Sequence, residues 1–584
     1  MTQTCRQCSA PFEVTPADLA FLAKISPVFC GKKFTIPPPT LCPDCRQQRR
    51  LLWRNERNLY RRTCDLCKKS IISQYSPDKP FTVYCTECWW SDKWDPMSFG
   101  RDFDFSKPFF EQFRSLQVKV PRLALNVVGN ENAEYVHLSG YNKNCYLLFA
   151  AEYNEDCYFG TQVVKSINCM DAFDCFESEY CYEVTDVEKC HTVLFSRSCS
   201  TCSDSAFLFD CRGCSECLFS ANLRNANQVV CNRQCTPAEY AREKTLLQQR
   251  LDRGELPQMQ REFQELECGC LHRSQDSVNC ESATGDYLKN CRNVRGCFDL
   301  SYGEDCAYVF TGYHVRDLMD VCHTTDAEMG YEGISLGYTS YNTICTHGSW
   351  SGKNLLYCDT VQAGCTDLFG CVMVKKQQHC ILNKQYSKEE YETLVPRIIA
   401  HMRKTPLRFF GASEGQASLR SPSGNSAGQE WCEFFSPAVA PFAYNETTAQ
   451  IYFPLSESEA AQRGFPWKDP NDEPMSVEKI IAARDIPPAI ASVPDDILHW
   501  AVECEATKRP FKIIKQELEF YRKMHLPVPH VHPDDRHRRR MMLRNPRTLW
   551  SRKCAKCGKA IETTYSPERL ERVYCEECYL KEVY

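Results

Sequence analysis

The sequence predicts a mixed, β-rich protein in which zinc-ribbon modules at both termini flank a duplicated, cysteine-rich, parallel β-solenoid-like middle with helical inserts. The first observation is an internal repeat, because PDCRQQRRLLWRNERNLYRRTCDLC at 43–67 returns as PDDRHRRRMMLRNPRTLWSRKCAKC at 533–557. The second is a content of 40 cysteines in 584 residues, with regular spacings in the middle of the chain. The third is a shorter repeat, in which Asn232, Gln234 and Tyr240 return 151 positions later. Together these repeats predict a protein built by duplication.

Cysteine pairs in residues 1–120 predict a tandem zinc-ribbon module with two structural zinc sites. Each site combines two Cys-x2-Cys pairs, with 33 residues between the pairs in the first site and 17 in the second. Because each turn directs two sulfurs to one point, two such pairs supply the four thiolates that a tetrahedral Zn²⁺ takes. With all four positions filled by thiolates, the zinc is expected to be structural rather than catalytic. The predicted ligands are Cys5, Cys8, Cys42 and Cys45, with Cys30 as a substitute, and then Cys64, Cys67, Cys85 and Cys88.

Arginines are interleaved with aromatic residues in the connector between the two sites, and an Arg-rich connector returns in the C-terminal copy. Arginine beside aromatic side chains suits phosphate contact and base stacking, which favours nucleic acid, and RNA in particular, as the partner. The alternative is a linker helix whose arginines are solvated or pair with the acidic middle of the same chain. The candidate nucleic-acid-binding residues are Arg46, Arg49, Arg50, Arg54, Arg57, Arg61, Arg62, Arg536, Arg538, Arg539, Arg540, Arg544, Arg547 and Arg552.

The middle of the chain reads as two solenoid halves, at 121–268 and 269–410. Short β-prone pieces alternate with cysteines, and the cysteine spacings are repeatedly 12 or 21 residues. Such spacing predicts stacked rungs in which cysteine fills a narrow interior and Asn or Asp turns the corners. A charged helical segment follows each half, and the first is expected to form a hairpin broken near Gly254 and Pro257. The spaced cysteines include Cys145, Cys157, Cys169, Cys181, Cys190, Cys202, Cys211 and Cys231.

Three chemical alternatives for the middle remain open but are weaker. Cys211, Cys214 and Cys217 have the spacing that begins an iron–sulfur run, yet the following Cys-Pro element is missing. An extra zinc on Cys199, Cys202, Cys211 and Cys214 is a further alternative. The segment at 333–337 matches G-x-S-x-G but lies among Gly/Tyr repeats rather than at a strand–turn–helix junction.

The remaining segments complete the predicted domain order. Residues 411–430 are rich in Gly, Ser and Ala and predict a flexible linker, and 431–500 predict an irregular Pro/aromatic docking segment. Residues 501–584 are the C-terminal copy of the zinc-ribbon module, whose intact site predicts the ligands Cys554, Cys557, Cys575 and Cys578. The first site of this copy is degenerate, because its set has become Cys504, Thr507, His532 and Asp535. Threonine is not a zinc ligand, so we expect this set to have lost its metal.

The charge of the chain is distributed unevenly. Residues 1–90 and 500–584 each carry a net charge of +7, whereas residues 122–383 carry −14. Basic ends favour an anionic partner, and pairing with the acidic middle is the equal alternative. No apolar leader follows Met1 and no run reaches a membrane span, so a cytoplasmic protein with reduced thiols is expected.

Distinctive segments of the chain resemble a known family. GKKFTIPPPTLCPDCRQQRR, YSPDKPFTVYCTECWWSD, DFSKPFFEQF and the NCYLLF, NLRN and NKQYSKEEY pieces carry the resemblance over nearly the whole chain. The family is a cysteine-rich one of uncultivated small-genome bacteria, with zinc ribbons at both ends and a cysteine-rich middle. The resemblance implies this architecture and no particular activity. Some members carry names of coenzyme A transferases, and no motif in this sequence supports that activity.

We therefore expect a zinc-binding, non-enzymatic scaffold or binding protein with three structural Zn²⁺ sites. Nucleic acid, with RNA favoured, is the expected partner of the Arg-rich connectors. A protein–protein interaction scaffold built on the solenoid is the first alternative. A metal or redox protein that uses the cysteines outside the ribbons is the second. The sequence identifies no small-molecule substrate and no membrane partner.

Overall fold

The chain forms two compact units, and each unit combines one end of the sequence with one part of the middle. The computed structural model describes residues 1–406, 409–410, 417–418, 428–469 and 477–584, so most of the predicted linker at 411–430 lies outside the described residues. Unit 1 contains Met1–Leu125 and Gln275–Asp469, and unit 2 contains Asn126–Ser274 and Pro470–Tyr584. The N-terminal module therefore shares a unit with the second half of the middle, and the C-terminal module shares one with the first half.

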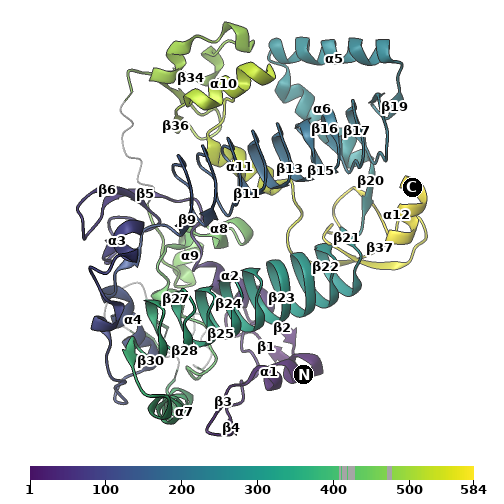
Figure 1. Cartoon of the computed structure of the whole chain (residues 1–584). Helices are drawn as coiled ribbons and strands as arrows, with labels where there is room; N and C mark the ends of the chain where they lie inside the picture. Colours follow the sequence, from purple (N-terminus) through teal and green to yellow (C-terminus); the bar gives the residue numbers. More distant parts are fainter. Residues whose placement is uncertain (407–408, 411–416, 419–427, 470–476) are drawn as a thin grey trace. The chain divides into compact units, whose positions relative to one another are not determined.

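The part of unit 2 that comes from the middle of the chain forms a parallel β-ladder from residue 127 to residue 234, named ladder 1 (Figure 1). Its rungs pair in parallel at an offset of 12 residues, as in the series Met170, Tyr182, Leu194, Ala206, Leu218 and Val230. An antiparallel pair, β18 with β19, ends the ladder. The strands are β9 (Val127–Val128), β10 (Ser139–Gly140), β11 (Thr161–Val164), β12 (Met170–Phe176), β13 (Tyr182–Glu188), β14 (His191–Leu194), β15 (Arg197–Ser200), β16 (Ser203–Phe209), β17 (Leu218–Ala221), β18 (Val229–Val230) and β19 (Arg233–Gln234).

A three-residue period shapes each 12-residue rung. Every third residue has a left-handed backbone, beginning with Asn132 and continuing through Asn144, Asp156 and Asn168. The residue after each of these turns points inward, so Cys145 and Cys157 are buried in the interior of the ladder. Four such three-residue sides complete one rung. The interior is narrow, and it is filled by Cys, Val, Ala, Leu, Ser and Asn.

Inward cysteines and serines make the same hydrogen bonds in this interior. The Cys157 thiol donates to the carbonyl of Glu155 at 3.4 Å, and the Ser178 hydroxyl donates to the carbonyl of Phe176 at 2.8 Å. Both side chains are small, and both satisfy a backbone carbonyl two residues earlier. Cysteine therefore acts in the ladder as a small side chain with a weak S–H donor.

The part of unit 1 that comes from the middle of the chain forms a second parallel ladder, from residue 277 to residue 385, named ladder 2. Its offset is mostly 12 residues, but it is 11 at the start, between β21 and β22, and 13 between β24 and β25 and again between β26 and β28. Asp171 and its counterpart Asp320 are 149 positions apart, whereas Asn232 and its counterpart Asn383 are 151 positions apart. The two 13-residue steps account for this difference. The strands are β21 (Ser277–Val278), β22 (Glu281–Lys289), β23 (Arg292–Thr325), β24 (Glu328–Gly337), β25 (Tyr341–Trp350), β26 (Lys353–Leu356), β27 (Asp359–Gln362), β28 (Thr366–Phe369), β29 (Val372–Lys375), β30 (Gln378–Ile381) and β31 (Lys384–Gln385).

A helix with a capping box follows each ladder. Thr236 begins α5 (Pro237–Asp252) with Glu239, and Ser387 begins α7 (Lys388–Lys404) with Glu390. In both, the hydroxyl accepts an N–H of the first turn while the glutamate accepts the N–H of the cap. After α5 the chain turns at Gly254 into α6 (Leu256–Gly269).

The two terminal modules share one order of elements. The N-terminal module has the hairpin β1 (Thr2–Thr4) and β2 (Pro11–Glu13), then α1 (Pro16–Ile25), β3 (Val28–Phe29), β4 (Lys32–Lys33), α2 (Pro43–Leu51), β5 (Tyr60–Thr63), β6 (Ser70–Ser73), β7 (Val83–Tyr84) and α3 (Thr86–Trp90). The C-terminal module has β35 (Trp500–Glu503), β36 (Pro510–Phe511), α10 (Lys515–Met524), α11 (Pro533–Met542), β37 (Trp550–Lys553), β38 (Ala560–Thr563), β39 (Arg572–Tyr574) and α12 (Glu576–Val583). The two modules differ in the pair β3 and β4, which is present in the N-terminal module.

Connecting segments pack the modules onto their ladders within each unit. In unit 1, η1 (Pro96–Phe99), α4 (Phe109–Lys119) and β8 (Arg122–Leu123) follow α3, and β8 pairs with β7. Later in unit 1 come η2 (Pro437–Val439), η3 (Tyr444–Glu446), α8 (Thr448–Tyr452) and α9 (Glu457–Gln462). In unit 2, β20 (Leu271–Arg273) pairs with β39. The remaining elements are the pair β32 (Phe409–Phe410) and β33 (Ala417–Ser418) of unit 1, and β34 (Lys479–Ala482), η4 (Ala483–Asp485), η5 (Ile490–Ser492) and η6 (Asp495–His499) of unit 2.

The β-rich class with helices is confirmed, and clusters of cysteines lie in both terminal modules. None of the helices in the described part of the chain is long and apolar enough to cross a membrane.

The left-handed positions of ladder 1 give a test of the three-residue period. At Asn168, where φ is 53°, glycine fits the backbone without strain, whereas a β-branched side chain is strained. Asn168→Val should lower the free energy of unfolding by about 1–3 kcal/mol. Asn168→Gly should change it by about 1 kcal/mol or less. Urea unfolding followed by far-UV circular dichroism measures both, and equal losses would contradict the left-handed assignment.

Candidate metal centres and the helices they hold

Three groups of four cysteines have the geometry of metal sites, and their members are the twelve predicted ligands. In each group the four sulfur atoms lie within 4.8 Å of one another. The groups are Cys5, Cys8, Cys42 and Cys45, then Cys64, Cys67, Cys85 and Cys88, and then Cys554, Cys557, Cys575 and Cys578. Cys30, the predicted substitute, is not part of the first group, and its thiol faces the carbonyl of Glu392 at 3.5 Å.

The sulfur separations fit a tetrahedral metal. The Cys8–Cys42, Cys67–Cys85 and Cys557–Cys575 sulfurs lie 3.7, 3.9 and 3.8 Å apart. Metal–sulfur bonds of about 2.3 Å, the zinc value, place tetrahedral ligands about 3.8 Å apart. The donor set and its spacing therefore fit a closed four-thiolate site.

Backbone N–H groups lower the pKa of one thiol in the second group and of one thiol in the third group. Burial raises the pKa of Cys64, but N–H groups of Cys67, Cys85 and Leu66 outweigh it and lower the pKa to about 6. Burial and the neighbouring thiols instead raise the pKa of Cys88 to about 12. Cys554 and Cys578 repeat this contrast, with a pKa of about 6 and of about 12. Four adjacent thiolates repel one another, so full ionisation of the set requires a bound cation.

The metal-type groups also fix the starts of three helices. Cys42, Cys85 and Cys575 are the N-cap residues of α2, α3 and α12. In α2 the ligand Cys45 lies one turn into the helix, directly before Arg46. The first group therefore lies directly before the arginines of α2.

The fourth, degenerate set is held together by hydrogen bonds. Thr507 Oγ1 donates to Asp535 Oδ2 at 2.7 Å, and the Cys504 thiol donates to the same oxygen at 3.5 Å. His532 caps α11, because its Nδ1 accepts the N–H of Asp534 at 3.1 Å. Among the described residues, the sets with ligand atoms gathered for a metal are the three groups of four cysteines, and this fourth set is not one of them. Thr507 and Asp535 thus stand where the first group has Cys8 and Cys45.

The arginines of α2 are buried against carboxylates of ladder 2. Arg46 Nε lies 2.8 Å from Asp320 Oδ2, and Arg50 lies 3.3 Å from Asp320 and 2.9 Å from Glu332. Arg49 bridges Glu332 at 2.9 Å and Glu433 at 2.8 Å. The side chains of Arg50 and Asp320 are both 0 % exposed. Burial alone would lower the pKa of Arg46, but the Asp320 carboxylate outweighs it and raises the pKa.

The arginines of α11 repeat this network in ladder 1. Arg536 lies 3.1 Å from Asp171, and Arg540 lies 2.9 Å from Asp171 and 3.2 Å from Glu183. Arg539 lies 2.8 Å from Glu183. Each of these arginines is 490 positions after its counterpart in α2, and each carboxylate is 149 positions before its counterpart in ladder 2. The two interfaces are therefore one arrangement present twice.

The predicted nucleic-acid-binding arginines all have partners within the protein in this structure. Arg54 donates to Ser335 Oγ at 2.8 Å, and Arg544 lies 3.2 Å from Asp186. Arg62 and Arg552 donate to the backbone carbonyls of Phe81 and Ser566, each in its own terminal module. Arg538 is exposed and pairs with Asp535 at 2.8 Å. Arg61 is exposed, and Arg57 and Arg547 are half-buried. Phosphate contact by Arg46, Arg49, Arg50, Arg54, Arg536 and Arg540 does not fit their positions, because all six are buried.

The sequence did not single out the carboxylates of these interfaces. Asp171, Glu183, Asp320 and Glu332 lie among many acidic residues in a long repetitive segment. Each pair is 12 residues apart, which places its members on adjacent rungs of one column. The 12-residue spacing and the recurrence after 149 positions were the signals that could have found them.

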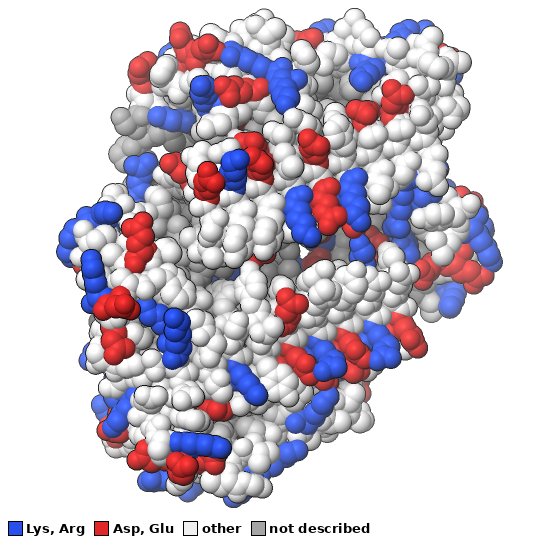
Figure 2. Space-filling view, viewed as in Figure 1, with Lys and Arg blue, Asp and Glu red and all other residues white. Residues whose placement is uncertain are grey.

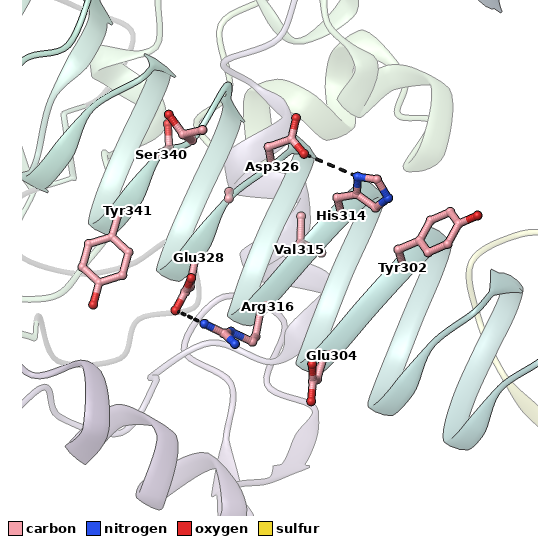
Figure 3. Close-up of a pocket in the computed structure, with 11 residues that line it drawn as sticks. Tyr302, Glu304, His314, Val315, Arg316, Asp326, Glu328, Ser340 and Tyr341 are labelled. Atoms are coloured by element: carbon pink, nitrogen blue, oxygen red, sulfur yellow. Dashed lines mark hydrogen bonds and ion pairs between the residues drawn. The ribbon is translucent and has the colours of Figure 1, made fainter.

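A shallow hollow of about 530 Å³ lies on ladder 2 (Figure 3). Two rows of side chains border it, one with His314 and Asp326 at 3.6 Å and the other with Arg316 and Glu328 at 2.6 Å. Tyr302 and Tyr341 lie toward opposite ends of the labelled group. The hollow thus offers aromatic rings and charged atoms on an open face.

These features describe a class, a cysteine-rich protein whose terminal modules carry metal-type thiol groups and dock onto parallel ladders. No family model matches the sequence. A search among curated proteins also returns no match.

Metal content distinguishes the three thiol groups from the fourth set. We expect three metal ions per chain, and about two after Cys67→Ser, since a closed site needs all four thiolates. Asp535→Asn should leave the number at three, because the fourth set is closed by hydrogen bonds. Inductively coupled plasma mass spectrometry on the purified full chain gives these numbers. Four ions in the parent chain with three in Asp535→Asn would contradict the assignment of the fourth set.

Removal of one shared carboxylate tests the buried network. Glu332→Gln keeps the side-chain shape but removes the negative charge that pairs with Arg49 and Arg50. Because this leaves two buried arginines without that counter-charge, the change should destabilise unit 1 by about 3–5 kcal/mol. Glu183→Gln is the equivalent change in unit 2. Glu328→Gln is the control at a partly exposed surface pair, and it should cost about 1 kcal/mol or less.

Hydrogen exchange of the α2 and α11 amides, with urea midpoints, measures these losses. Similar exchange in Glu332→Gln and Glu328→Gln would show that the buried pairs do not hold α2.

Proposed function

We propose that the protein is a zinc-dependent, non-enzymatic scaffold. Each ladder is a parallel β-solenoid, and each terminal module is a zinc-organised clamp on its solenoid. In this proposal the three groups of four cysteines hold Zn²⁺, because four thiolates at tetrahedral spacing are the donor set of structural zinc. The metal supplies folding energy to short ribbons rather than a reactive centre.

The duplicated arginine–carboxylate network is the observation that carries this proposal. It directs the basic residues of α2 and α11 into the protein, where they join each module to its ladder. Much of the positive charge of the two ends is therefore paired with carboxylates inside the units. The outward-facing side chains of adjacent rungs, named the outer rows, form an extended surface on each ladder. Repeat proteins commonly bind partners on such extended surfaces.

The outer rows offer regular, mixed charge. Figure 2 shows Lys and Arg alternating with Asp and Glu on the surface. Some of these charges pair between adjacent rungs, as Lys143 does with Glu155 at 2.8 Å and Arg316 with Glu328 at 2.6 Å. Mixed charge with interspersed tyrosines favours a protein partner over a uniformly anionic one.

Nucleic acid is the competing partner. In that hypothesis RNA contact would depend on the exposed and half-buried arginines, such as Arg57, Arg61, Arg538 and Arg547. Few phosphate contacts predict weak binding with a shallow dependence on salt.

The test compares RNA binding with protein capture by the zinc-loaded full chain. Filter binding of a mixed-sequence RNA at 0.15 M salt should give a Kd no tighter than the roughly 10⁻⁴–10⁻⁶ M of non-specific binding. In nuclease-treated extract of the native cells, cross-linking should map a protein partner to outer ladder rows. Nanomolar RNA affinity that is lost in Arg57→Ala/Arg61→Ala/Arg538→Ala would overturn the protein-scaffold proposal.

A further inference from the structure

One face of α2 is covered by a segment of its own unit. Residues 430–453, named the strap, contain α8, which packs against α2. Gln48 donates to the Tyr444 hydroxyl at 2.7 Å, and Arg49 donates to Glu433 at 2.8 Å. The Trp53 ring lies 4.5 Å from the ring of Phe435. The strap therefore supplies an acid and aromatic rings to this face.

The strap also fixes the end of α2 and the ribbon beyond it. The N–H of Thr448 donates to the carbonyl of Arg54 at 3.0 Å. Glu446 accepts the hydroxyl of Tyr60 at 2.6 Å. As a result the whole face, Gln48, Arg49, Leu52 and Trp53, is buried, and Leu52 is 0 % exposed.

The equivalent face of α11 is exposed. Arg538, Arg539, Met542 and Leu543 occupy the positions 490 residues after Gln48, Arg49, Leu52 and Trp53, and are named the α11 face. Met542 is 78 % exposed and Leu543 is 39 % exposed. The side chain of Arg539 is 43 % exposed and pairs with Glu183, the counterpart of Glu332. Arg49, its own counterpart, has the strap carboxylate of Glu433 in addition.

The α11 face keeps the chemistry that the strap recognises. Two arginines lie beside methionine and leucine, so the face combines positive charge with adaptable apolar surface. A strap-like segment complements both, since its glutamate can pair with Arg539 and its aromatic rings can cover Met542 and Leu543. In unit 1 the chain itself provides such a segment, whereas the α11 face presents the same positions to solvent.

We propose that the α11 face is a docking site for a peptide segment of another protein in which an acidic residue directly precedes aromatic residues, as Glu433 precedes Phe434 and Phe435. This proposal rests on the scaffold function and names the chemistry of one partner. The partner docks as the strap docks on α2, with its acid at Arg539 and its rings over Met542 and Leu543.

The strap itself provides the probe. A fluorescein-labelled peptide copying residues 430–453, with Cys432 replaced by Ser, is titrated with zinc-loaded full chain in a fluorescence anisotropy assay. Met542→Glu places a carboxylate at the centre of the docking surface and, being exposed, leaves the fold intact. It should weaken binding about tenfold or more. A peptide with Glu433→Lys should lose affinity to a similar extent, because it reverses the charge that faces Arg539.

Leu570→Glu is the matched control. Leu570 is also in the C-terminal module and is strongly exposed, but it lies outside the α11 face. It should bind the peptide as the parent chain does. Equal weakening by Met542→Glu and Leu570→Glu, or no binding below about 1 mM, overturns the docking site. Displacement of the probe from the Met542 surface by mixed-sequence RNA, at a lower concentration than by unlabelled peptide, assigns the face to nucleic acid and overturns the proposal as well.

The outcome is separable from that of the scaffold proposal. A chain that keeps three metal ions and its cross-linked partner on the ladder rows, but does not bind the peptide, loses only the α11 docking site. A chain without metal, whose modules do not hold their ladders, loses the scaffold itself.

Discussion

The buried contact between guanidinium groups and carboxylates is the interaction on which both units depend. Removing an arginine and an aspartate from water costs several kcal/mol per ion, and only close, multiple pairing offsets that cost. Here each carboxylate serves two arginines, since Asp320 meets Arg46 and Arg50, and Asp171 meets Arg536 and Arg540. A misplaced helix would leave several buried charges unpaired. The network therefore selects one position of each helix on its ladder.

The ladder and the helix contribute complementary regularities to that network. Residues 12 positions apart lie on adjacent rungs, so Asp320 and Glu332 form a short column of negative charge. Residues four apart lie on one face of a helix, so Arg46 and Arg50 form a matching column of positive charge. The thiol group at the start of α2 fixes where that column begins. In unit 2 a hydrogen-bonded set has the same position before α11.

The two units differ in the residues before α2 and α11 and in the covering of one face of these helices. Metal-type thiols give way to Cys504, Thr507 and Asp535 in one copy, while the arginines and their carboxylates are kept in both. The strap covers α2, and the corresponding face of α11 is exposed. The shared part thus assembles each unit, and the proposed docking face lies in a part that differs.

Local signals in the sequence predicted the three groups of four cysteines and the 12-residue spacing of the middle. Cysteine pairs such as Cys64 and Cys67 are local signals, because a turn of fixed length brings both sulfurs to one point. The spacing from Cys145 to Cys157 likewise gave the length of a rung, although the three-residue period beneath it was missed. Whether an arginine of the connectors is buried and paired is known only from the tertiary structure. Arg50 and a solvated arginine look alike in sequence, since burial depends on Asp320 and Glu332, about 270–280 residues away.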